Sequence, residues 1–218
     1  MIGQMGSFTR PSADTGDVLD LYLHGYVSSR LINLSRNNGN SAENESGLPI
    51  TIGASHIDGL VLSLTPNSHS YNYRSAVLFG RAEAVTEVDE KLWAMELITN
   101  SVVRDRYRHT RVPPSGAEMQ STTVLRVKIT TGSAKIRSGM PSDDKADLED
   151  EGLLERVWTG VVPVHYTFGK PMPGPYNRVE KVPGYIEEFV RESNEDASDV
   201  AMEAATKAMK PKARKGED

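Results

Sequence analysis

The sequence predicts an α+β fold that is mainly β: an antiparallel sheet closing into a small barrel, with helices at its ends. Three observations support this class. Segments with strand-like composition outnumber helical ones, and one long segment, residues 86–105, has clear helical periodicity. Strands and helices do not alternate as they do in a parallel sheet, which excludes a doubly wound fold.

The first half of the chain predicts four strands and a short helix. Residues 17–25 alternate leucines with other side chains, as a half-buried strand does. Residues 26–36 carry apolar side chains at helical spacing, and two serines sit where the first turn should be. A polar loop follows at 37–47. The other strands are expected at 48–55, 58–65 and 73–86, with Gly80 as a candidate bulge.

The second half begins with the clearest helix, 86–105, whose acidic start at Asp89 and Glu90 suits the positive end of a helix. Residues 121–139 read as two strands joined by a turn near Gly132. The remaining segments are expected as a basic loop at 106–116, an acidic solvated stretch at 142–152, a strand at 157–169, extended chain at 170–184 and a helix at 185–192.

Domain organisation follows from a change of composition near residue 194. Residues 1–193 contain all the predicted strands and form the expected domain. Residues 194–218 are rich in alanine, then basic, and contain no aromatic residue. We expect them to form a disordered or partly helical tail that adds nothing to the core.

Composition excludes several classes of function. The 218 residues are 38% hydrophobic and 25% charged, with a net charge of −5, so a nucleic-acid or membrane partner is not expected. The absence of Cys excludes disulfides and thiolate catalysis, and the five His lack helical metal-site spacing. No apolar stretch has the length of a signal peptide or membrane span, so a cytoplasmic location is the default expectation.

The segment HGYVSSRL, residues 24–31, is the first candidate site. A strand ends, and a helix begins with two hydroxyls, Ser28 and Ser29, and a cation, Arg30. Helix starts bind anions readily, and Arg adds a charge-assisted fork, so a phosphate site is one interpretation. An ordinary helix cap with a surface Arg is the other.

The segment NSHSYNYRSAVLFG, residues 67–80, is the second candidate. His69, Tyr73, Arg74 and Ser75 lie just ahead of an apolar strand. A planar heteroaromatic ligand needs this mixture of donors and aromatic walls. A polar loop that caps one end of the barrel is the competing interpretation.

A third group lies further along the chain. Lys135 and Arg137 alternate on one face of a short strand, and Trp158 starts another strand. They could contact an anion and wall a pocket, or form a solvated face and a core aromatic. No catalytic triad, dinucleotide fingerprint or P-loop is present, and the carboxylates cluster in exposed acidic stretches.

Taken together, the segments LYLHGYVSSRL, HIDGLVLSLTPNSHSYNYRSAVLFGRAEAV and WTGVVPV…GKPMP resemble the FMN-binding split-barrel family. The resemblance is to its pyridoxamine 5′-phosphate oxidase-related branch, which includes nitroimidazole-reductase-like flavin-nucleotide-binding proteins. It covers most of residues 18–173. It implies a six-stranded antiparallel Greek-key barrel that works as a homodimer, with FMN in a groove between the subunits.

The resemblance also implies roles for particular residues. The positions of His24, Ser28, Ser29 and Arg30 hold the flavin phosphate, and those of Tyr73, Arg74 and Ser75 lie along the isoalloxazine ring. Trp158 matches an aromatic position that approaches the cofactor from the dimer side. His69 matches a histidine near the flavin, and we interpret it as a proton donor or anion contact on the substrate side.

Family members carry further residues, including two strands, before the strand that matches residues 17–25. MIGQMGSF resembles the end of the second of these strands, which predicts a chain truncated at its N-terminus. The function expected from the resemblance is an FMN-dependent oxidoreductase. A flavin-binding module without catalysis and a fragment with impaired flavin binding stay open as alternatives, and heme or a deazaflavin is a minor alternative to FMN.

Overall fold

The computed structural model describes residues 1–14, 16–17, 19–38 and 46–207. Residues 39–45 of the predicted polar loop and residues 208–218 of the predicted tail lie outside this set. The chain divides into two compact units. Unit 1 comprises Met1–Gly53 and Val77–Ser133, and unit 2 comprises Ala54–Ala76 and Ala134–Asp218. Each unit is described by itself.

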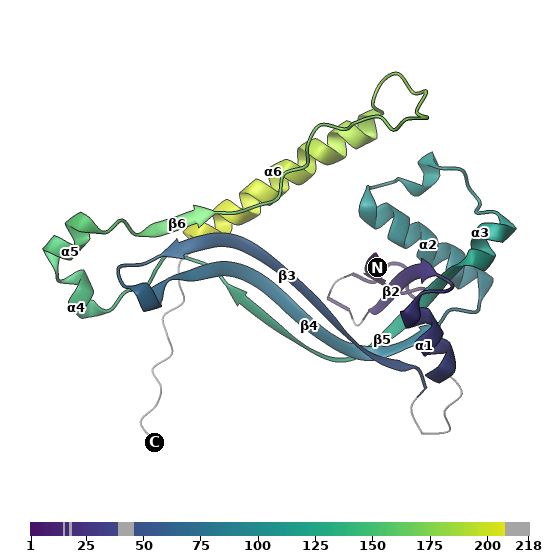
Figure 1. The fold of residues 1–218 in the computed structure, drawn as a ribbon, viewed down its shortest axis with the longest axis horizontal. Coiled ribbons are helices and arrows are strands. Elements are labelled where there is room, and N and C mark those ends of the chain that lie inside the picture. The colour runs from purple at the N-terminus through teal and green to yellow at the C-terminus, as the bar shows by residue number, and fades with distance from the viewer. Residues whose placement is uncertain (15, 18, 39–45, 208–218) are drawn as a thin grey trace. The chain divides into compact units, whose positions relative to one another are not determined.

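Six strands and the helices between them make up the fold (Figure 1). Unit 1 alone contains β1 (Gly3–Gly6), β2 (Asp20–Tyr26), α1 (Arg30–Asn38), α2 (Val88–Val102), the 3-10 turn η2 (Tyr107–His109) and α3 (Gly116–Ser121). Unit 2 alone contains the 3-10 turn η1 (Pro66–Ser68), α4 (Lys145–Leu148), α5 (Glu151–Arg156), β6 (Gly160–Pro163) and α6 (Gly184–Thr206). Three long strands run from one unit into the other: β3 (Leu48–Leu62), β4 (Ser70–Ala84) and β5 (Thr122–Arg137).

The strands form one sheet in the order β1-β2-β5-β4-β3-β6. β2 pairs antiparallel with β1 and with β5, and β3 pairs antiparallel with β6. Neighbours in the sheet are often distant in sequence, as in a Greek-key arrangement. The predicted α+β, mainly β class is confirmed.

The core of unit 1 follows from the alternation of side chains along β2. Leu21 and Leu23 point to one face and pack with Leu125 and Val127 of β5. Tyr22 points to the other face, where it packs under α2. This alternation was the basis for predicting the strand, and it fixes which side of β2 each following residue occupies.

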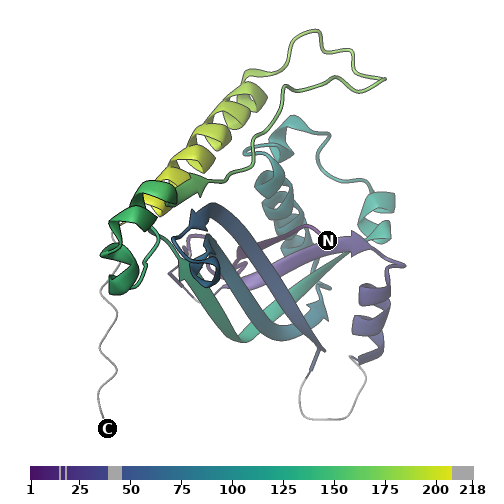
Figure 2. The ribbon, with the colours of Figure 1, turned by 60° about the vertical axis from the view of Figure 1, so that its left-hand side comes forward.

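Unit 2 is organised around α6, which lies beside β6 in both views (Figures 1 and 2). The expected tail boundary at residue 193 falls inside this helix. Near the helix end, Ala201 and Ala205 are buried, and the carbonyl of Ala204 accepts from Gly139 N–H at 2.7 Å and from Asn72 Nδ2 at 3.2 Å. Residues 194–206 therefore belong to the packed part of unit 2.

Two predicted breaks are absent from the structure. Residues 48–62 form one strand, β3, where two were expected. β5 passes through Gly132 without a turn, because the neighbouring strand comes close there: a Cβ at Gly132 would lie 2.7 Å from Leu78 Cδ2. The strand predicted at 157–169 is limited to Gly160–Pro163. The acidic stretch at 142–152, expected to be solvated, contains α4 and the start of α5.

Gly80 is a point of close strand approach inside continuous β4. A Cβ at Gly80 would lie 2.4 Å from the carbonyl oxygen of Lys128, which is backbone and cannot move aside. We expect Gly80→Ala to destabilise the fold by about 1–3 kcal/mol, as overpacking does. Urea unfolding of Gly80→Ala beside Gly53→Ala measures this, because a Cβ at Gly53 meets nothing within 4 Å. Equal stability of the two variants would contradict the close approach.

Candidate functional site

The turn between β2 and α1 holds the first predicted residues. Ser29 N–H donates to the carbonyl of Tyr26 at 2.8 Å, and the Ser29 carbonyl accepts from Asn33 N–H at 3.0 Å. The chain therefore passes from strand to helix within a few residues. Ser28 and Ser29 lie in the turn, and Arg30 is the first residue of α1, with an exposed side chain.

The Ser29 hydroxyl is buried and has no hydrogen-bond partner among the described residues. Buried hydroxyls are nearly always paired, so this one needs an explanation. The first turn of α1 contains no acidic side chain. The first N–H groups of a helix lack intrahelical partners and carry partial positive charge. The junction is therefore suited to an anionic group such as a phosphate.

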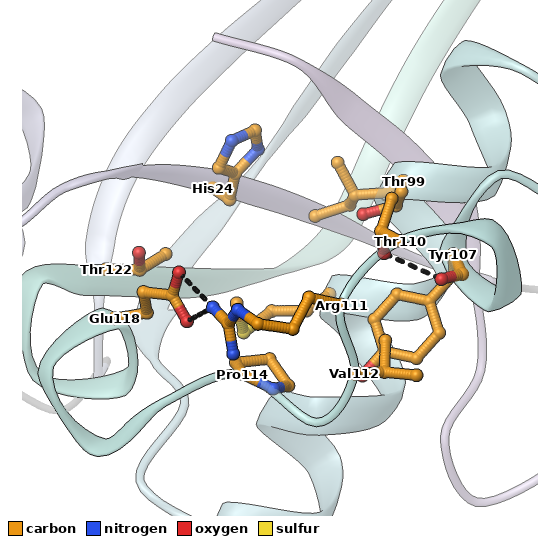
Figure 3. A pocket seen from close by; sticks show the side chains of 11 residues that line it. His24, Thr99, Tyr107, Thr110, Arg111, Val112, Pro114, Glu118 and Thr122 are labelled. Carbon is orange, nitrogen blue, oxygen red and sulfur yellow. Dashed lines mark hydrogen bonds and ion pairs between the residues drawn. The ribbon is translucent and has the colours of Figure 1, made fainter. Parts of the chain in front are cut away.

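His24 lies on the other face of β2 from this junction. A Cβ on Gly25 would lie 3.6 Å from Ser29 Oγ, and successive strand residues point to opposite faces. His24 shares its face with Tyr22 and lines a cavity of about 460 Å³ within unit 1 (Figure 3). The resemblance implies that His24 lies with Ser28, Ser29 and Arg30 at one phosphate site. In the structure His24 lies on the opposite face of β2 from that site.

The cavity beside His24 has apolar and polar walls. Met95, Ile98 and Thr99 come from α2, and Thr122 comes from the start of β5. The other lining residues are Tyr107, Thr110, Arg111, Val112, Pro114 and Glu118. Figure 3 shows Arg111 paired with Glu118 in this cavity. The cavity can take a ligand with an apolar face and polar edges.

Glu118 fixes this wall of the cavity. It accepts hydrogen bonds from the Arg111 guanidinium and from Ser115 N–H, and Ser115 caps α3 in return. The hydrogen bond from Arg111, followed by those from Ser115, lowers the pKa of Glu118 to about 2. The carboxylate therefore stays ionised, and Arg111 stays held, throughout the physiological pH range.

In unit 2, the three consecutive residues Tyr73, Arg74 and Ser75 lie on β4 and point to alternate faces. Ser75 Oγ donates to the carbonyl of Lys135 at 3.2 Å, and Lys135 Nζ lies 5.9 Å from the centre of the Tyr73 ring. Arg74 points the other way and donates through Nε and Nη2 to Asp58, at 2.9 and 2.8 Å. Tyr73 and Ser75 share a face, whereas Arg74 does not.

His69 and Trp158 also belong to unit 2. His69 Nδ1 lies 2.9 Å from the Thr65 carbonyl oxygen. Because a carbonyl only accepts, Nδ1 carries the proton and Nε2 is left as an acceptor when the ring is neutral. The Trp158 side chain is 66% exposed, so it is not a core residue within the described chain.

Sequence reasoning missed the cavity residues and the role of Asp58. The segment 106–116 was identified only as a basic loop, although Ser115 and Glu118 carry the spacing of a capping box. Asp58 is separated from Arg74 by 16 residues and by η1, so no local pattern connects them. The sequence predicts Lys135 and Arg137 as a candidate pair of anion contacts. In the structure Arg137 Nη1 donates to Asn72 Oδ1 at 2.6 Å.

Among the described residues, no group of three or more His, Asp or Glu side chains could hold a metal ion. The helices they form include none long and apolar enough to cross a membrane.

Solved structures share this fold. The flavocytochrome Anf3 from Azotobacter vinelandii is 27% identical, with a TM-score of 0.63, over 78% of this chain and 72% of that one. The FAD and heme binding protein from Mycobacterium smegmatis is 25% identical, with a TM-score of 0.65, over 78% of this chain and 77% of that one. The class of protein is therefore that of the split-barrel fold.

The family follows from a direct match. The family model described as pyridoxamine 5′-phosphate oxidase matches residues 12–136, more than half of the chain. The chain therefore belongs to the pyridoxamine 5′-phosphate oxidase family. A comparison with curated proteins gives no match.

Proposed function

We propose that the protein binds FMN, with the phosphate at the start of α1. The buried hydroxyl of Ser29, which has no partner among the described residues, carries this proposal, because a phosphate oxygen would satisfy it. Ser28 adds a second hydroxyl, and Arg30 adds a charged fork. The family match and the printed descriptions of the two similar structures, a flavocytochrome and an FAD and heme binding protein, support a flavin.

The isoalloxazine ring needs an aromatic or apolar wall and donors at its edge. We assign the wall to the Tyr73 ring and an edge donor to its phenol; Ser75 shares this face of β4, where its hydroxyl donates to the Lys135 carbonyl and leaves its lone pairs for the ring edge. Trp158, which is exposed, would wall the ring from the dimer side. We assign Arg74 elsewhere, because it faces away from Tyr73 and Ser75 and is held by Asp58. The flavin would supply the redox chemistry, and the chain's own residues would bind and orient it.

The absorbance spectrum tests flavin binding. The purified protein is mixed with FMN, and excess FMN is removed on a desalting column. We expect a retained flavin band with a maximum shifted from that of free FMN. Complete loss of the flavin on desalting would contradict the proposal.

The activity we propose is that of a flavin-dependent oxidoreductase. His69, whose ring is oriented by the Thr65 carbonyl, would exchange a proton with the substrate through Nε2. The reaction class is tested by adding NADH or NADPH under anaerobic conditions and following bleaching of the flavin band. Bleaching with turnover of an added electron acceptor supports an oxidoreductase. A flavin that no nicotinamide reduces would favour a binding module without catalysis.

His69→Ala is expected to lower turnover about 10²-fold or more, the usual contribution of a general acid or base. The affinity for FMN should stay within about twofold, because His69 is assigned to the substrate side. Steady-state rates and a fluorescence titration on the same sample measure both quantities. His109→Ala is the control, since His109 lies in unit 1 outside all the assigned positions. Unchanged turnover in His69→Ala would refute the role.

A homodimer is part of the proposal, because unit 2 exposes large apolar side chains that a second copy could cover. Among the most exposed are Ile136, Trp158, Met172 and Tyr176. Light scattering after size exclusion is expected to give about twice the chain mass of 23.9 kDa. A monomer mass with FMN present would contradict a flavin site that needs two subunits.

Heme, in addition to the flavin, is a second candidate ligand, favoured by the cavity in unit 1. Its His24 imidazole has a buried Nδ1 without a hydrogen-bond partner among the described residues, and apolar side chains line its walls. Both similar structures are described as carrying a cytochrome or heme function. His24 would be the ligand to iron, and Arg111 would meet a propionate. A Soret band that forms with hemin in the wild type but not in His24→Ala supports this, and equal spectra contradict it.

A further inference from the structure

A second, smaller cavity lies within unit 2, on the face of β4 that carries Arg74. Its volume is about 200 Å³. The lining residues are His56, Asp58, Arg74, Val164, His165, Tyr166, Phe168 and Ala197. Among the residues assigned to FMN above, none lines it. The proposed flavin site therefore leaves this cavity without a role.

The charged part of the cavity is an ordered guanidinium. The Asp58 side chain is 5% exposed and accepts from Nε and Nη2 of Arg74, whose side chain is 48% exposed. The two hydrogen bonds from Arg74 to Asp58 use the Nε–Nη2 edge of the guanidinium. The edge that carries Nη1 is left to bind a ligand. A guanidinium held in this way is pre-oriented for a planar, bidentate acceptor such as a carboxylate.

Exposed aromatic side chains form the rim of the cavity, with Tyr166 77% and Phe168 50% exposed, and they make contacts of their own. The rings of His56 and Tyr166 meet edge to face, with centroids 5.6 Å apart. Both backbone groups of Phe168 bond to the side chain of Asn194 on α6, at 2.7 and 3.0 Å. The Phe168 ring also packs edge to face on Phe189, 5.4 Å away. These contacts order the aromatic side chains beside Arg74.

Two imidazoles supply further polar groups. Within the described part of the chain, the imidazole nitrogens of His56 and His165 form no hydrogen bond or ion pair. Each can therefore donate to, or accept from, a ligand edge. On α6, Ala197 lines the cavity with a small side chain. The volume suits a single substituted ring and excludes a flavin or a nucleotide.

We propose that this cavity binds a small planar aromatic carboxylate, with the carboxylate on Arg74 and the ring between Tyr166 and Phe168. Three features together specify this ligand: a guanidinium positioned by a buried acid, aromatic side chains in the lining, and room for one ring. The proposal does not depend on the flavin, since the cavity lies within unit 2 and shares no residue with the assigned phosphate site.

Benzoate is the probe, and calorimetric titration of the full chain at millimolar concentrations is the measurement. Saturable binding of benzoate is expected, with benzamide at least about tenfold weaker because the charge-assisted bond to Arg74 is lost. Acetate, which lacks the ring, should not bind detectably. Equal affinity for benzoate and benzamide, or no saturable binding of benzoate, would overturn the proposal.

Variants on α6 locate the site without disturbing the Asp58–Arg74 pair. Ala197→Leu fills the cavity from a helical position that tolerates leucine, and it should weaken benzoate binding at least about tenfold without lowering the Tm. Val200→Leu, on the same helix and outside the cavity, should bind as the wild type does. If Ala197→Leu keeps wild-type affinity, benzoate binds elsewhere and the assignment fails.

Discussion

Replacing Glu90 with glutamine is expected to lower the free energy of unfolding by about 3 kcal/mol, the low end of the cost of breaking a buried ion pair. The Glu90 side chain is 8% exposed, and its Oε1 accepts from Tyr22 OH at 2.8 Å and from Arg126 Nη1 at 2.9 Å. Glutamine keeps the shape and one acceptor oxygen but removes the charge.

The loss is large because Arg126 has little other support. Its Nε is already buried without a hydrogen-bond partner among the described residues, and Glu83 Oε2 lies 3.8 Å from Nη2. Tyr22 would also lose its charged acceptor. Burial, and then the hydrogen bond to Glu90, raises the pKa of Tyr22 well above its ordinary value, so the phenol stays a donor.

Urea unfolding with linear extrapolation measures the difference, provided the slope is unchanged. Glu87→Gln is the matched control, because Glu87 is exposed and directly precedes the same helix. The control should stay within about 0.5 kcal/mol of wild type. A Glu90→Gln variant as stable as Glu87→Gln would mean that the buried ion pair does not stabilise unit 1.

Replacing Arg30 with glutamine is expected to weaken FMN binding about 10- to 100-fold. A hydrogen bond to a charged group contributes about 1.5–3 kcal/mol, and each 1.4 kcal/mol is a factor of ten in affinity. Folding should be unaffected, because Arg30 is exposed at the start of α1. Ser29→Ala should act in the same direction, since its hydroxyl has no partner among the described residues.

Arg36→Gln is the control for charge. Arg36 lies in the last turn of the same helix, where its guanidinium donates to Thr123 Oγ1 at 3.4 Å. Removing it changes the net charge by the same amount but leaves the helix start intact. Equal losses of FMN affinity in Arg30→Gln and Arg36→Gln would indicate general electrostatic attraction and contradict a phosphate site at the start of α1.

Much of the fold could be predicted because local patterns determine it. Alternation along β2 and helical periodicity along α2 depend only on neighbouring residues, and both elements lie close to their predicted positions. The missed features depend on distant partners. The sequence predicts a turn at Gly132, whereas in the structure this glycine lies within β5, close to Leu78 of the neighbouring strand. The composition of residues 194–206 predicts a tail, whereas in the structure Asn72 and Gly139 donate hydrogen bonds to the Ala204 carbonyl.

The candidate site divides in the same way. The helix start after Ser28 and Ser29 was visible in the sequence, because caps and turns are local. The sequence does not show which residues pack against each face of β2. That His24 faces a cavity becomes clear only in the structure, where α2 lines the same cavity. Arg74 was predicted beside a ligand, but its partner Asp58 and the aromatic lining residues come from two other segments of the chain.

Comparing FMN with riboflavin is the most direct test of the phosphate site. The two flavins share the ring and differ in the phosphate, so their difference in affinity measures what the start of α1 contributes. Fluorescence titrations of the wild type should show FMN binding at least about 100-fold tighter than riboflavin, with the difference much reduced in Arg30→Gln. Equal affinities for FMN and riboflavin, or no binding of either, would contradict a phosphate held by Ser28, Ser29 and Arg30.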